Sequence, residues 1–192
     1  MKKALIFILI IGLLTFAGCG RDTAFDDGDG DEADSGSRTV VIKGEEFDVD
    51  ATRLVLSRKN LTSSDVSPVR RMVNLTFLEL KSNNITSVNW ASRLTKLERL
   101  DLSLNEISDL TPLANLTELQ RLDLRLNDIS SLSGLENLTR LTDLDLGSNY
   151  ISDVRLLMGL TNLRTLYLND NPIPEDMYDV LRAALPDTNI YF

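Results

Sequence analysis

Apolar residues recur along the chain with a period of 22 residues, most clearly after residue 72. In each copy a segment such as Leu100-Asp101-Leu102 alternates apolar and polar positions, which predicts a short strand with one buried face. The copies occupy residues 72–93, 94–115, 116–137, 138–159 and, in part, 160–171. A repeat of this length and regularity predicts a solenoid, in which each coil buries its apolar side chains against the next coil.

One polar residue recurs with the same period inside the apolar pattern. An asparagine stands three residues after the second strand leucine of every copy, at Asn83, Asn105, Asn127, Asn149 and Asn171. We expect its side chain to point into the coil, where the amide can bond the backbone of the turn and of the neighbouring coil. The column is therefore predicted to be a structural ladder and not a polar active site.

The pattern L-x-x-L-x-L-x-x-N-x-I resembles the leucine-rich repeat family in its short, 22-residue bacterial form. The tails Ile-Ser-Asp-Leu and Thr-Pro-Leu resemble internalin-type repeats. This resemblance implies an α/β solenoid with a curved parallel β-sheet on the concave side and short 3-10 or loop segments on the convex side. It also implies that ligands meet the concave sheet.

Residues 38–71 are interpreted as an N-terminal cap followed by a degenerate first repeat. Two short apolar segments, 40–42 and 47–49, are expected to be strands of this cap. The segment Leu54-Val55-Leu56 then begins a coil that carries Lys59 in the asparagine position. A solenoid needs such a cap because its first coil would otherwise expose its apolar side.

The repeats proper are assigned to residues 72–171, and residues 172–192 are interpreted as a C-terminal cap. Apolar residues at helical spacing predict a helix over 175–185, which Pro186 ends. The last residues, 189–192, are expected to add an edge strand to the sheet. The chain thus reads as a β-rich N-cap, a repeat array and a helical C-cap.

Residues 1–18 have the features of a targeting signal. Lys2 and Lys3 precede an apolar run over residues 4–17, which is shorter than the roughly 20 residues of a membrane-spanning helix. The sequence Thr-Phe-Ala-Gly before Cys19 resembles a bacterial lipobox, although Phe16 stands where that motif usually has leucine. The resemblance implies cleavage before Cys19 and lipidation of its sulfur. The alternative is an ordinary signal peptide with an unrelated cysteine.

Residues 19–37 carry one arginine against seven acidic residues, together with four glycines and two serines. Such a composition cannot bury enough apolar surface to offset the entropy of ordering, so a disordered, extended tether is expected. Asp27, Asp29 and Asp31 alternate like the first ligands of a calcium loop. However, Glu32 stands where such a loop requires glycine, so a solvated linker is the preferred interpretation.

Composition excludes several classes of protein. The net charge of −9 is the wrong sign for a nucleic-acid binder. The chain has no histidine and one cysteine, so His-dependent catalysis and thiolate metal cages are excluded. The repeats also contain no phosphate-binding glycine loop. We therefore expect neither an enzyme, nor a metal site, nor a cofactor.

The outward positions of the predicted strands form the candidate binding surface. Four carboxylates stack in one column, with arginines beside them that are expected to offset their repulsion, and exposed apolar side chains lie nearby. The candidate ligand-binding residues are Phe77, Glu79, Arg99, Asp101, Leu104, Arg121, Asp123, Arg125, Leu126, Asp145 and Tyr167.

These features together predict a lipid-anchored protein of the cell envelope that binds a protein partner through its concave face. Lipid on Cys19 would attach it to a membrane, at the outer membrane or facing the periplasm in a Gram-negative envelope, and at the cell surface otherwise. The alternatives are a structural envelope lipoprotein without one specific ligand and an adhesin-like surface protein. The exposed apolar residues and the final edge strand also offer surfaces for self-association.

Overall fold

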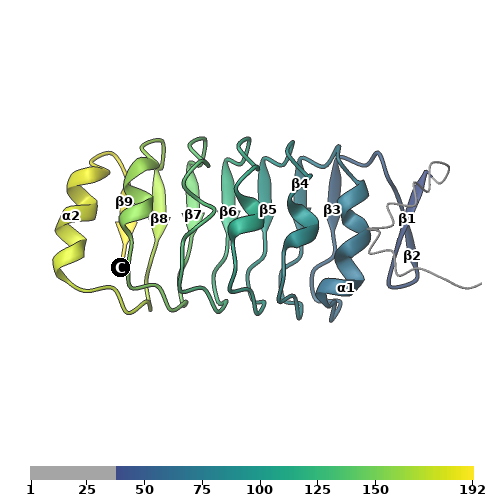
Figure 1. Ribbon diagram of the computed structural model, residues 1–192, viewed down its shortest axis with the longest axis horizontal. Helices are drawn as coiled ribbons and strands as arrows, with labels where there is room; N and C mark the ends of the chain where they lie inside the picture. Colours follow the sequence, from purple (N-terminus) through teal and green to yellow (C-terminus); the bar gives the residue numbers. More distant parts are fainter. Residues whose placement is uncertain (1–37) are drawn as a thin grey trace, which may run out of the picture. The chain divides into compact units, whose positions relative to one another are not determined.

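A computed structural model of the chain describes residues 38–192. Its main feature is a sheet of seven parallel strands that lie side by side in chain order (Figure 1). The strands are β3 (Arg53–Val55), β4 (Phe77–Glu79), β5 (Arg99–Asp101), β6 (Arg121–Asp123), β7 (Asp143–Asp145), β8 (Thr165–Tyr167) and β9 (Asn189–Tyr191). The predicted signal peptide, Cys19 and the acidic segment 19–37 lie outside the described residues.

Short helical segments form the second layer of the solenoid. They are α1 (Ser63–Val66), the 3-10 helices η1 (Ser67–Arg71), η2 (Asn89–Ala91), η3 (Thr111–Leu113) and η4 (Arg155–Gly159), and α2 (Asp176–Ala184). Neighbouring segments are close in space: η1 is near η2, η2 near η3, and η4 near α2. The predicted α/β solenoid, with a parallel sheet on one side and short segments on the other, is confirmed.

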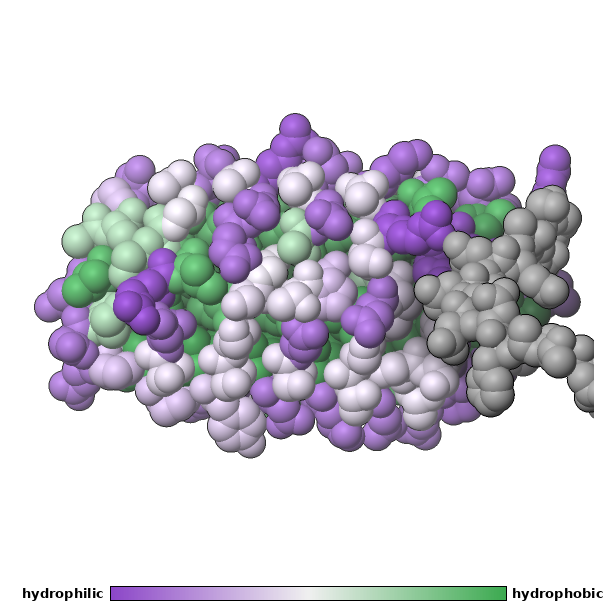
Figure 2. Space-filling view, in the orientation of Figure 1, coloured by the Kyte–Doolittle hydropathy of each residue, from purple (hydrophilic) through white to green (hydrophobic). Residues whose placement is uncertain are grey.

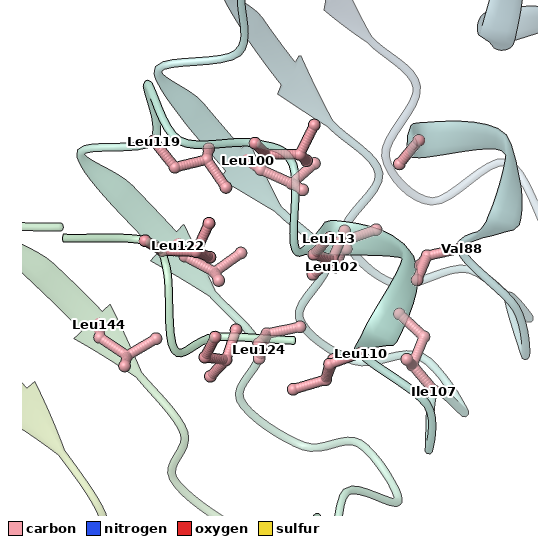
Figure 3. Close-up of a cluster of buried hydrophobic side chains, with 14 of the residues drawn as sticks. Val88, Leu100, Leu102, Ile107, Leu110, Leu113, Leu119, Leu122, Leu124 and Leu144 are labelled. Atoms are coloured by element: carbon pink, nitrogen blue, oxygen red, sulfur yellow. The ribbon is translucent and has the colours of Figure 1, made fainter. Parts of the chain in front are cut away.

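The repeated apolar positions fill the space between the two layers. The central leucine of each repeat strand is at most 4% exposed, and the helical side of each coil adds residues such as Ile107, Leu110 and Leu113. Figure 3 shows these side chains pointing toward one another from neighbouring coils. Full burial of one leucine or isoleucine contributes about 1.5–3 kcal/mol. The core is continuous through the stack, so each coil depends on its neighbours.

Polar side chains cover most of the outer surface. On the face seen in Figure 2, hydrophilic residues predominate, and hydrophobic residues show mainly in the recesses between them and near the ends of the solenoid. Within residues 38–192, no helix is long and apolar enough to cross a membrane.

A β-hairpin caps the first coil. Its strands, β1 (Thr39–Ile42) and β2 (Glu45–Asp48), pair antiparallel, and β2 begins two residues earlier than the sequence predicted. Lys43 Nζ, in the hairpin turn, donates hydrogen bonds to the carbonyl oxygens of Lys59 and Asn60 at 2.8 and 3.0 Å. These bonds tie the hairpin to the coil in which Lys59 replaces the asparagine of the later repeats.

The other end is closed by α2 and β9. The helix is one residue shorter at each end than predicted, and β9 pairs parallel with β8 as the expected edge strand. The ring of Tyr178 in α2 stacks on that of Phe192, with centroids 3.9 Å apart. This contact holds the last residues of the chain against the helix.

The convex side changes form in one repeat. Residues 111–113, Thr-Pro-Leu, form η3, whereas the equivalent Ser-Gly-Leu at 133–135 forms a turn. Gly134 there has φ +103°, and a Cβ on it would lie 2.3 Å from the carbonyl oxygen of Leu110 in the preceding coil. Only glycine fits this close approach of two coils.

Candidate binding face on the parallel sheet

Two columns of outward side chains cross the sheet. Because the central residue of each strand points into the core, its first and third residues point outward. The first column is Arg53, Phe77, Arg99, Arg121, Asp143, Thr165 and Asn189, and the third is Val55, Glu79, Asp101, Asp123, Asp145, Tyr167 and Tyr191. We call this surface the strand face. From β3 to β8 its columns follow the register expected from the repeats.

A hollow of about 270 Å³ opens on the strand face between β4 and β8. It brings together seven of the eleven candidate residues, together with Asp143 and the central leucines: Phe77, Arg99, Asp101, Arg121, Asp123, Asp145 and Tyr167. Glu79, Leu104, Arg125 and Leu126 are not part of its lining. The hollow therefore uses the two outward columns, and the residues that follow each strand lie outside it.

The four carboxylates Glu79, Asp101, Asp123 and Asp145, here called the carboxylate stripe, stand on adjacent strands. The three aspartates each accept a hydrogen bond on Oδ1 from the backbone N–H two residues later, at 2.9–3.0 Å. Glu79 instead accepts from the Ser57 hydroxyl at 2.7 Å. An aspartate that bonds its own backbone in this way stabilises the turn after the strand. The repeated aspartate thus has a structural role as well as a position on the surface.

The sequence predicted that arginines beside the stripe would offset the repulsion among its carboxylates, but no arginine of the described residues forms an ion pair with them. On the strand face the arginine ion pair joins Arg121 to Asp143, in the neighbouring column, at 3.4 Å. Within residues 38–192, no lysine or arginine nitrogen lies within 4.0 Å of a stripe carboxylate oxygen. Backbone N–H groups and serine hydroxyls, which are neutral donors, bind these carboxylates instead. The aspartate side chain is short enough to reach the backbone of its own turn. The repeat pattern shows which residues are neighbours but not this bond, so the sequence did not predict it.

Asp123, the third member of the stripe, has an unusual acidity. Burial on the strand face raises its pKa to about 6, against an ordinary value of 3.8, and the charges of Asp101 and Asp145 add to the rise. The hydrogen bond from the Arg125 N–H opposes it and is outweighed. Burial, and to a smaller degree the like charges beside it, therefore disfavour the ionised form of Asp123.

Aromatic side chains stand at both ends of the hollow. The guanidinium of Arg53 lies 3.5 Å from the ring centroid of Phe77, a cation–π contact. At the other end Tyr167 stacks on Tyr191, with centroids 4.8 Å apart, and Tyr191 is 49% exposed. Tyr191 was missed by the sequence analysis, although continuing the column onto the predicted final strand would have found it.

Leu104 and Leu126 lie at the turn that follows each strand and are 40% exposed. Their backbones are left-handed, with φ of 58° and 56°, as at the equivalent Ser148. Leucine is unfavourable in this conformation. The geometry places these two leucines at the border of the strand face and not inside the hollow.

The asparagine ladder lies behind the strand face, inside the coils. Asn127 Oδ1 accepts from the backbone N–H of Ile107, and its Nδ2 donates to the carbonyls of Leu102 and Leu124, all at 3.0 Å. Asn105 and Asn149 make the corresponding bonds. Each asparagine thereby joins two coils and leaves no polar group of its own unpaired, so the ladder offers no ligand site.

No group of three or more acidic or cysteine side chains within residues 38–192 is arranged to hold a metal ion. The aspartates of the stripe do not form such a group, because each binds the backbone of its own turn through Oδ1. The chemistry that the strand face offers is recognition by charge, hydrogen bonding and aromatic contact.

Comparison with known proteins agrees with this architecture. The family profile described as leucine-rich repeats (2 copies) matches residues 73–115, 117–157 and 139–182. A comparison with curated proteins gave no match.

Several solved structures are similar to the chain. An internalin, InlF, from Listeria monocytogenes has 29% sequence identity and a TM-score of 0.67, over 77% of this chain and 50% of its own. A leucine-rich repeat protein from Leptospira interrogans has 31% identity and a TM-score of 0.62, over 66% and 33%. Internalin C2 of L. monocytogenes has 31% identity and a TM-score of 0.59, over 72% and 69%.

The chain spans half of the internalin InlF structure and a third of the Leptospira structure. Both of these solved structures are therefore longer than the part that they share with this chain. Since the family profile matches more than half of the sequence, and the strands repeat in the same register, the chain belongs to the leucine-rich repeat family.

Proposed function

We propose that this chain is a protein-interaction module that binds a protein partner on its strand face. The observation that carries the proposal is the hollow of about 270 Å³, whose walls are charged and aromatic side chains from adjacent strands. The leucine-rich repeat fold supports it, because domains of this kind commonly act in protein–protein recognition. The role is one of binding and not of catalysis.

The arrangement suits recognition for two physical reasons. Tyrosine and arginine are enriched among the residues that dominate binding energy, and both line the hollow, as Arg99 and Tyr167. Their strands are held by a continuous leucine core, so the surface is ordered before the partner arrives. A preorganised surface loses less conformational entropy on binding than a flexible one.

We also propose that the protein is anchored to the cell envelope by lipid on Cys19, with residues 20–37 as the tether. The sequence Ala-Gly-Cys at the end of the apolar run supports this. Two or more acyl chains give stable anchoring, whereas one alone is marginal. Metabolic labelling with palmitate should mark the wild type and leave Cys19→Ser unlabelled. A labelled Cys19→Ser protein would contradict the proposal.

The binding proposal is tested by affinity capture from an envelope extract with the full chain as bait. A strand-face variant carries Phe77→Ser, Arg99→Ser and Tyr167→Ser. A matched control carries Tyr150→Ser, Arg93→Ser and Leu156→Ser, which change one aromatic, one arginine and one aliphatic residue that are exposed outside the sheet. Circular dichroism melts establish that all three proteins are folded.

We expect a partner that the wild type and the control retain and the strand-face variant loses. Equal capture by the strand-face variant would show that binding, if present, uses another surface. Capture of no specific partner by any of the proteins would favour a structural envelope protein without a single ligand.

A further inference from the structure

We propose that the strand face takes an extended, cationic peptide segment, which lies along the carboxylate stripe and carries lysine or arginine at alternate positions. This inference rests on the proposed function and names the chemistry of the partner. It follows from the unpaired charge of the stripe, from its length and from the aromatic residues at its ends.

The stripe retains hydrogen-bonding capacity toward a ligand. Each of Asp101, Asp123 and Asp145 uses Oδ1 for its own turn, and within residues 38–192 no donor binds their Oδ2 atoms. An ionised carboxylate oxygen is an acceptor, so Oδ2 can bind the N–H groups of an incoming lysine or arginine. The three aspartates line the hollow, where a ligand would exclude water and strengthen the interaction.

Within residues 38–192, no cation forms an ion pair with these carboxylates, although the charge of Lys81 slightly opposes the rise in the pKa of Asp123. Of the arginines in the first column, Arg121 is paired with Asp143 and Arg53 lies over Phe77. Burial, together with the charges of Asp101 and Asp145, raises the pKa of Asp123. A cation brought by a partner would reduce the repulsion among the stripe carboxylates, so a cationic partner is complementary in charge to the stripe.

The length of the stripe fits an extended segment. Four residues on adjacent parallel strands span about 14 Å, because strands lie about 4.8 Å apart. An extended peptide rises about 3.4 Å per residue, so side chains at positions i, i+2 and i+4 point the same way and also span about 14 Å. Three alternate lysines would therefore reach along the stripe. Tyr167, which follows Asp145 in the column, would contact a residue beyond them, and Phe77 lies beside the Glu79 end.

The test uses three labelled nine-residue peptides and fluorescence anisotropy with the full chain. One has lysine at three alternate positions, with serine and glycine elsewhere. The second has glutamate in place of lysine, and the third has the same three lysines placed consecutively. Each is titrated into the wild type at low and at physiological salt, since screening weakens exposed charge pairs.

Two variants with the same change in net charge separate the stripe from general acidity. The stripe variant is Asp101→Asn, Asp123→Asn and Asp145→Asn, in which the amide oxygen can still accept the bond from the turn. The control variant is Glu98→Gln, Glu106→Gln and Asp128→Asn, which are exposed and lie off the strand face. The acidic residues 19–37 are present in every protein, so the difference between the variants reports the stripe alone.

We expect the alternating lysine peptide to bind the wild type and the control variant within twofold of each other, and the stripe variant at least tenfold more weakly. Binding should also weaken with salt, the consecutive lysines should bind less well, and the glutamate peptide should not bind. Equal loss in both variants, unchanged binding to the stripe variant, or preference for the glutamate peptide would overturn the inference.

The peptide titration and the capture experiment can fail independently, so they distinguish an error in the proposed function from an error in the proposed cationic partner. If a captured partner is lost on changing Phe77, Arg99 and Tyr167 but binds the stripe variant as well as the wild type, the protein is a binding module and the cationic partner is wrong. If capture fails for every protein while the lysine peptide still distinguishes the two variants, the stripe binds cations and the proposed protein partner is wrong.

Discussion

Asp123 accepts a hydrogen bond on Oδ1 from the backbone N–H of Arg125, at 3.0 Å. The same carboxylate stands between Asp101 and Asp145 in the sheet register. The bond stabilises the turn, while burial and, to a smaller degree, the neighbouring charges raise the pKa and disfavour ionisation. The Oδ1 atom of Asp123 thus stabilises the turn, whereas the negative charge of its carboxylate destabilises the fold. A substitution that keeps the oxygen and removes the charge separates the two effects.

Replacing Asp123 by asparagine should stabilise the protein above neutral pH. The oxygen that binds the turn is kept, and the charge is removed. We expect a gain on the order of 1 kcal/mol at pH 7.5, below what the full pKa shift would give, because the side chain is partly exposed and solvent screens it. Urea unfolding followed by circular dichroism measures the change.

The gain should depend on pH with a defined sign. Asp123 binds its proton more tightly in the folded protein, with a pKa of about 6 against 3.8, so ionisation lowers stability. That cost is absent below about pH 4 and complete above about pH 6, so the advantage of the variant should shrink as the pH falls from 7.5 to 4. A gain that is the same at both pH values, or that Asp128→Asn reproduces, would contradict this explanation.

Gly134→Ala should destabilise the protein by about 3 kcal/mol or more. The new Cβ would lie 2.3 Å from the Leu110 carbonyl oxygen, and φ of +103° is strained for any residue with a side chain. Gly159→Ala is the matched control, because a Cβ there meets nothing within 4 Å. Similar unfolding midpoints for the two variants would show that the coils can move apart at Gly134 without cost.

Asn127→Ala should lower the free energy of unfolding by about 2–4 kcal/mol. The change leaves the Ile107 N–H and the carbonyls of Leu102 and Leu124 without their partner in a buried site. Asn137→Ala, at an exposed position, should change the stability by less than about 0.5 kcal/mol. Equal unfolding curves for the two variants would argue against a structural ladder.

Leu126→Asn should raise the stability by about 0.5–1 kcal/mol. Leu126 has φ of 56°, a left-handed conformation that asparagine adopts more readily than leucine. Leu156 has the same 40% exposure and lies in η4, where φ is helical, so Leu156→Asn should give no gain. A gain of the same size in both variants would indicate an effect of polarity and not of backbone conformation.

The sequence by itself determined the solenoid and the register of its sheet. A period of 22 residues leaves one way to stack the coils, because the strand leucines must all face the core. The register then follows, so Arg99, Arg121 and Asp143 share a column, as do Asp101, Asp123 and Asp145. The asparagine column was predictable for the same reason, since a polar residue repeated inside the coil must bond backbone.

Only the tertiary structure decided what each outward side chain contacts. Whether Asp123 bonds an arginine or its own turn depends on rotamers and on distances of a few tenths of an ångström, which a periodic pattern does not contain. The hollow, the stack of Tyr167 on Tyr191 and the close approach at Gly134 arise between neighbouring coils, at positions where the side chains differ from one coil to the next. Periodicity sets backbone positions, whereas contacts depend on the packing of particular neighbours.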